Sequence, residues 1–254
     1  MTRTAGYVYV ALALGFLYGP IAIMILLAFN ASPLYELPFQ FDLGWFVRLS
    51  SDTRLIHASI NSVALATANA VLATIIGVPA ALALGRRQFR ARALLYGLLL
   101  PPITIPWLII ATAMLLFFFW TGIGRGFPAM LIGHIAVSLP YVILVLIARL
   151  QGQDLTVEEA ATILGASKFY VFRRVTLPLL LPGVVAALLF AFTVSFDNFV
   201  ISYFLAPPGV STLPVEIYSA IRAGFTPEVN AVSAIIFALS MGVLVLASRF
   251  TRFV

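Results

Sequence analysis

The chain has 254 residues, of which 62% are apolar and only 9% are charged. Soluble domains carry about 25% charged residues and disordered chains have low hydrophobicity, so this composition excludes both classes and indicates an integral membrane protein. The net charge of +6 does not indicate nucleic-acid binding, because the basic residues are scattered between apolar runs. The sequence has no cysteine, which excludes disulfides and cysteine-based metal sites.

Six apolar stretches are long enough to cross a bilayer as helices, which takes about 20 residues. The first stretch exceeds the roughly 7–15 residues of a signal-peptide core, so we expect it to be retained as a span. The sequence therefore predicts an all-α integral membrane fold with about six transmembrane helices in a single domain, residues 1–254. The stretches are residues 7–29, 57–84, 94–119, 128–149, 179–206 and 229–249.

Basic residues predict the orientation, because cytoplasmic loops of membrane proteins carry an excess of Lys and Arg. If the N- and C-termini are cytoplasmic, eleven of the 15 basic residues lie inside, and the dense cluster at 86–92 lies on a cytoplasmic turn. This cluster is a topology anchor or, alternatively, a site for membrane lipid headgroups. The eleven residues are Arg3, Arg86, Arg87, Arg90, Arg92, Arg149, Lys168, Arg173, Arg174, Arg249 and Arg252.

The third stretch contains three prolines in a segment of six residues: Pro101, Pro102 and Pro106. Each removes a backbone hydrogen bond that lipid cannot replace. We therefore expect this span to bend or break there. The bend has two interpretations, a structural kink or a hinge that lines the transport path.

The cytoplasmic connection at 150–178 predicts two short helices. Thr156 and Glu159 have the spacing of a capping box, which starts a helix. Gly165 follows at the position where a left-handed residue ends a helix. Ser167 is placed to cap a second helix. The pattern predicts a helix–turn–helix that is exposed on the cytoplasmic face for a partner.

This connection resembles the EAA loop of the permease subunits of binding-protein-dependent ABC importers. The matching residues are Glu159-Ala160-Ala161, Gly165 and Val175-Thr176-Leu177-Pro178, where the family commonly has Ile at the position of Val175. In that family the loop docks into a groove of the cytoplasmic ATPase subunit. The resemblance implies a type I ABC importer permease fold and a set of ATPase-coupling residues. These are Glu159, Ala160, Ala161, Gly165, Lys168 and Phe169.

Further along the chain the sequence is similar to the spermidine/putrescine-type permeases of this superfamily. The fifth stretch looks like theirs at Phe192–Ser202, although the family often has two adjacent acids where this chain has Asp197-Asn198. The resemblance implies a polyamine substrate. The alternatives are another amine or amino-acid-like solute, ferric iron, sulfate or thiamine.

Asp197 is the only acid predicted inside a span, where a charged group costs roughly 2.5–3.5 kcal/mol on insertion scales. It lines the substrate path, or it makes a structural hydrogen bond or a pair with a cation of a partner subunit, and the sequence leaves these interpretations open. Asn198, Trp107 and Tyr203 are the other substrate-path candidates. A lone histidine such as His134 is expected to be a packing residue. A metal site is not indicated, because no second histidine or carboxylate cluster lies near it in the sequence.

The chain has no P-loop motif, G-x-x-x-x-G-K-[ST], so it is not expected to be an enzyme or to bind a cofactor itself. The resemblance assigns ATP and Mg²⁺ to a partner ATPase dimer. It also implies a periplasmic solute-binding protein and a second permease subunit, which is a different chain or, alternatively, a second copy of this one. A membrane-embedded enzyme is disfavoured because no catalytic constellation lies within the spans. A stand-alone secondary transporter is disfavoured because no inverted repeat is visible. We therefore expect an ATP-driven importer subunit in the bacterial inner membrane, working by alternating access.

Overall fold

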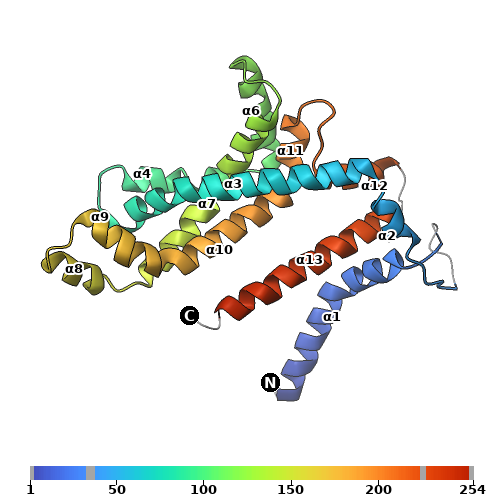
Figure 1. Ribbon diagram of the computed structural model, residues 1–254, viewed down its shortest axis with the longest axis horizontal. Coiled ribbons are helices and arrows are strands. Elements are labelled where there is room, and N and C mark those ends of the chain that lie inside the picture. The colour runs from blue at the N-terminus through green and yellow to red at the C-terminus, as the bar shows by residue number, and fades with distance from the viewer. Residues whose placement is uncertain (1–2, 33–37, 224–226, 252–254) are drawn as a thin grey trace. The chain divides into compact units, whose positions relative to one another are not determined.

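A computed structural model of the chain describes residues 3–32, 38–223 and 227–251, and the described elements are helical (Figure 1). Arg252 lies outside the described residues. The helices are α1 (Arg3–Ala28), α2 (Gly44–Leu49), α3 (Thr53–Arg86), α4 (Arg92–Gly97), α5 (Pro101–Thr104), α6 (Trp107–Trp120), α7 (Phe127–Gln151), α8 (Thr156–Ile163), α9 (Lys168–Val171), the π-helical turn η1 (Phe172–Thr176), α10 (Leu177–Phe196), α11 (Phe199–Leu205), α12 (Leu213–Ala223) and α13 (Pro227–Thr251).

The described helices agree with the predicted membrane spans. Four of them are long and apolar enough to cross a bilayer, namely α1, α3, α7 and the continuous helical segment Lys168–Phe196. The segments Arg92–Thr104 and Trp107–Trp120 are apolar enough together and are bent by 106° at their break, so they make a fifth candidate span if the bent pair counts as one. The sixth predicted span coincides with α13, in which Glu228–Ala238 is a shorter apolar helical segment.

The bend predicted in the third span is confirmed. It falls at Ile105-Pro106, where both residues are extended and the helix starts again at Trp107. Proline at 106 has no N–H to continue the helix and biases the preceding residue away from helical geometry. The proline cluster therefore sets a sharp change of direction.

The prediction of one continuous fifth span over 179–206 is wrong. Helix α10 ends at Phe196, and the chain restarts as α11 after Asn198. The side-chain oxygen of Asn198 accepts a hydrogen bond from the N–H of Ile201 at 2.9 Å. Asparagine is a favoured residue at this position because its oxygen satisfies a free amide at the helix start.

The chain separates into two compact units, residues 58–215 and residues 1–57 with 216–254. In the first unit, α7 is the central helix. Its apolar face packs between α3 and α10 toward one end, and against α6 and α11 toward the other. Small residues allow this close approach: a Cβ on Gly133 would lie 2.7 Å from Ile201 Cγ2 and 2.8 Å from Leu205 Cδ1.

In the second unit, α13 packs along α1 and against α2. Just after α1, the carbonyl of Asn30 accepts a hydrogen bond from the indole N–H of Trp45 at 2.7 Å. The ring of Phe29 lies 4.9 Å from that of Phe46. The connection between the first two spans is therefore an ordered cap in its described part.

Candidate functional site

The EAA-like loop folds as the predicted pair of short helices, α8 and α9. At the end of α8, Gly165 has φ +86°, and its N–H bonds to the carbonyl of Thr162 at 3.0 Å. The N–H of Ala166 bonds to the carbonyl of Ala161 at 3.1 Å, which completes a Schellman cap. The hydroxyl of Ser167 accepts from the N–H of Tyr170 at 3.3 Å and caps α9. The predicted turn chemistry is confirmed.

The predicted capping box at the start of α8 is wrong. Thr156 is already inside the helix, and Leu155 occupies the capping position without a side-chain bond. Asp154 supplies the acceptor instead, since its carboxylate receives the N–H of Thr156 at 2.9 Å. This backbone hydrogen bond holds the pKa of the Asp154 carboxyl below its usual value. Glu159 therefore does not form a capping box with Thr156, and its side chain is exposed.

Three large apolar side chains of this helix pair face solvent. Ile163, Leu164 and Phe169 are 84%, 87% and 71% exposed. A hollow of about 660 Å³ between α8 and α9 is lined by Glu159 and Lys168, which are two of the predicted coupling residues. Exposed apolar residues rimmed by charge are typical of protein or membrane interaction surfaces. Ala160 is exposed and Ala161 is half-buried on the same helix.

A second candidate site is a groove beside the break in the fifth span. Its volume is about 470 Å³, and it brings Asp197 together with Trp107 from the start of α6. The remaining walls come from α10: Ala186, Leu189, Phe190, Thr193 and Val194. Among the described residues that line it, Asp197 is the only carboxylate, so the groove combines one acid with aromatic and aliphatic walls.

The other two substrate-path candidates lie differently. Asn198 is buried, and its side chain caps α11. Tyr203 is exposed on α11, with its ring 5.2 Å from that of Phe199, and it is not part of the groove lining. The structure thus brings two of the four candidates together, and the assignment of all four to the substrate path stays a prediction.

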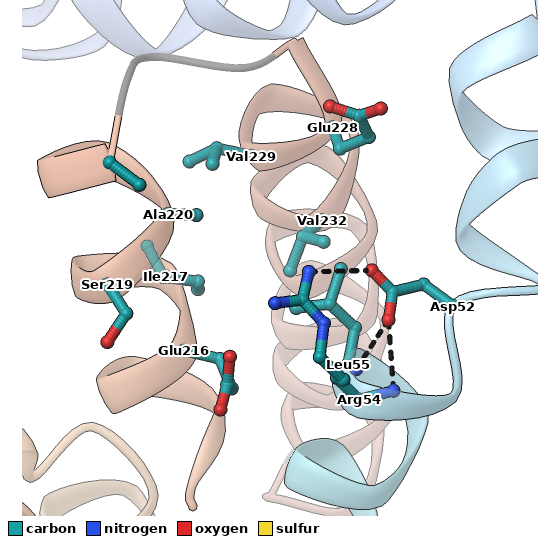
Figure 2. Close-up of a pocket in the computed structure, with 11 residues that line it drawn as sticks. Asp52, Arg54, Leu55, Glu216, Ile217, Ser219, Ala220, Glu228, Val229 and Val232 are labelled. Atoms are coloured by element: carbon teal, nitrogen blue, oxygen red, sulfur yellow. Dashed lines mark hydrogen bonds and ion pairs between the residues drawn. The ribbon is translucent and has the colours of Figure 1, made fainter.

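A third hollow, in the unit built from residues 1–57 and 216–254, was not anticipated from the sequence. It has a volume of about 480 Å³ and lies between α12, α13 and the first residues of α3 (Figure 2). Asp52 caps α3 by accepting from the N–H groups of Arg54 and Leu55, and it pairs with the Arg54 guanidinium at 3.5 Å. Glu216 and Glu228 also line the hollow. Three separated segments form it, so no local motif could have indicated it.

The family whose description is "Binding-protein-dependent transport system inner membrane component" matches residues 73–254. The chain belongs to this family of transport permeases. The permease is 39% identical over 238 residues to the spermidine/putrescine transport system permease protein PotC of Haemophilus influenzae, with 93% of this chain and 92% of the relative covered. It is 33% identical over 236 residues to the putrescine transport system permease protein PotI of Escherichia coli K12, with 90% and 84% covered.

The fold of this permease is also found in a solved ABC importer. The crystal structure of a bacterial ABC transporter involved in the import of the acidic polysaccharide alginate matches with a TM-score of 0.75 at 18% identity, covering 97% of this chain and 93% of that chain. The sequence-based predictions of an all-α membrane fold and of an importer permease are confirmed. The permease is a multi-pass protein of the bacterial inner membrane.

Proposed function

We propose that this permease forms half of the translocation path of an ATP-driven importer for polyamines. The observation that carries the coupling role is the folded EAA-like loop, which presents exposed apolar residues on α8 and α9. The chain has no P-loop, so ATP and Mg²⁺ are bound by a separate ATPase dimer that docks on this loop. A second permease subunit, expected to be a different chain, completes the path, and a periplasmic binding protein delivers the solute.

The groove at Asp197 supports the choice of substrate. A polyamine alternates protonated amines with short methylene chains. The Asp197 carboxylate offers a charged acceptor for one ammonium group, and Trp107 and Phe190 offer ring faces that attract a cation. The aliphatic walls formed by Leu189 and Val194 suit the methylenes. The similarity to permeases named for spermidine and putrescine supports the same choice.

The test uses the complete transporter in proteoliposomes with labelled spermidine or putrescine. Asp197→Asn keeps the shape of the side chain and removes its charge. We expect it to lower uptake about tenfold or more, since a hydrogen bond to a charged group contributes about 1.5–3 kcal/mol. Asp42→Asn removes an exposed carboxylate outside the groove and should leave uptake unchanged. Equal uptake by the two variants would show that Asp197 does not line the path.

The substrate itself is tested on the partner binding protein. Spermidine or putrescine should raise its melting temperature, whereas sulfate, ferric iron, thiamine and amino acids should not. Stabilisation by one of these other solutes would overturn the polyamine assignment and leave the permease role intact.

A further inference from the structure

A network of four polar side chains joins α8 to the ends of two membrane spans. The guanidinium of Arg86, the last residue of α3, forms an ion pair with Glu158 of α8 and donates to the side-chain oxygen of Gln153 at 2.9 Å. The other carboxylate oxygen of Glu158 accepts from the hydroxyl of Thr176 at 2.7 Å. Thr176 directly precedes α10. We call these four side chains the α8 latch.

The α8 latch, rather than apolar packing, attaches α8 to the ends of the two spans. None of the eight α8 residues, all within the described part of the chain, is buried, so apolar packing holds this helix only weakly. Glu158 and Glu159 are neighbours that both line the hollow between α8 and α9. The Glu158 carboxylate contacts Arg86 and Thr176, while the Glu159 side chain is exposed.

The pair is partly withdrawn from water, with side chains 16% and 19% exposed. Charges in this environment attract more strongly than surface pairs, which contribute about 0–1 kcal/mol. Arg86 Nε and Gln153 Nε2 are already buried without a hydrogen-bond partner among the described residues. Loss of Glu158 would therefore leave Arg86 with further unsatisfied donors, so the latch does not readily open.

We propose that Glu158 is a positioning residue for energy coupling: through the α8 latch it transmits a displacement of α8 at once to the end of α3 and to the start of α10. This proposal rests on the proposed function, since it assumes that an ATPase moves α8. A latch of this kind links one docking helix to two spans. Without it, α8 would stay joined to α7 and to α10 through the chain itself, but it would have no ion pair with the end of α3.

The test compares Arg86→Glu, Glu158→Arg and the doubly exchanged R86E/E158R permease in the complete transporter in proteoliposomes. The readout is the number of solute molecules imported per ATP hydrolysed, with ATPase docking measured by copurification and stability by melting temperature. Each single variant places two like charges in contact. We expect it to lower the ratio about tenfold, within the range of coupling free energies between sites, while ATP hydrolysis and docking persist. The double exchange should restore most of the ratio.

Arg90→Gln is the matched control, because Arg90 is exposed on the same cytoplasmic turn and lies outside the latch. Its ratio should equal that of the unmodified protein. If the double exchange fails to assemble, Glu158→Gln decides, since it keeps the shape and the acceptor for Thr176 and removes the charge. Single variants or Glu158→Gln with an unchanged ratio would overturn the latch. Failure of the unmodified transporter to couple hydrolysis to import would instead overturn the proposed function.

Discussion

His134 shows how one buried side chain holds a broken span together. Its Nδ1 lies 2.7 Å from the hydroxyl of Ser195 near the end of α10, and its Nε2 lies 3.0 Å from the hydroxyl of Ser202 in α11. A neutral imidazole has one donor and one acceptor, and a hydroxyl can complement either. The interpretation of His134 as a packing residue is confirmed, with the added detail that it bridges the break at Asp197-Asn198.

Replacement of His134 by leucine should destabilise the permease by roughly 1–2 kcal/mol, because it leaves two buried hydroxyls unpaired. Thermal unfolding of the purified protein measures this as a lower melting temperature. His57→Leu is the matched control, since the chain has two histidines and His57 is exposed. Equal melting temperatures for both variants would mean that the bridge contributes nothing to stability.

Gly165 is constrained by its backbone rather than by space. Its φ is +86°, and a Cβ added there would meet no atom of this chain within 4 Å. Gly165→Ala should cost about 1 kcal/mol at the turn, and Gly165→Asn should cost less because asparagine tolerates the left-handed region. Hydrogen exchange of the α8 and α9 amides measures the loss. Gly152→Ala, at a helix end with φ −85°, should not change it.

At the scale of helices, close packing against α7 depends on glycine. Gly133→Ala would force its Cβ against Ile201 and Leu205, and overpacking of this kind costs roughly 1–3 kcal/mol. Gly97→Ala at the end of α4 meets nothing within 4 Å and should be neutral. Melting temperatures of the two purified variants provide the comparison, and a neutral Gly133→Ala would show that α11 can shift away from α7.

The helices predicted from apolar runs lie where expected, because a helix needs an apolar run of about 20 residues to cross the bilayer. Changes of direction were predicted only where a strong local signal exists, as at Pro106. The break at Asp197-Asn198 was missed because the apolar character continues across it. Asn198 was a signal for a helix start, but it was interpreted as a path residue. At the start of α8, Asp154 and Thr156 are both residue types that commonly cap helices, so the sequence did not show which of them supplies the acceptor.

At the scale of the whole molecule, the predicted orientation can be tested on a background free of thiols, because the chain has no cysteine. With cytoplasmic termini, Gln88→Cys lies inside and Val210→Cys, at an exposed position, lies outside. A membrane-impermeant maleimide should label Val210→Cys in intact spheroplasts, and Gln88→Cys only after permeabilisation. Labelling in the reverse order would invert the assignment that rests on eleven of 15 basic residues.

The sequence could not indicate the long-range contacts that form the α8 latch and the groove at Asp197. Arg86 and Glu158 are 72 positions apart, and Arg86 was interpreted only as part of the basic cluster that sets orientation. Trp107 and Asp197 were both candidates, but nothing in the sequence placed them in one groove. The first pair depends on how α8 meets the end of α3, and the second on how the bent third span packs beside the broken fifth span.

The turn between α8 and α9 has a consequence for assembly. Its Schellman cap and the Ser167 cap keep both helices formed before any partner arrives. A segment that folds only on binding loses about 2–5 kcal/mol or more of interaction energy to ordering. A preformed helix pair avoids that loss, so association with the proposed ATPase partner should be close to a rigid-body encounter. Affinity would then depend on the match between two surfaces that are already formed.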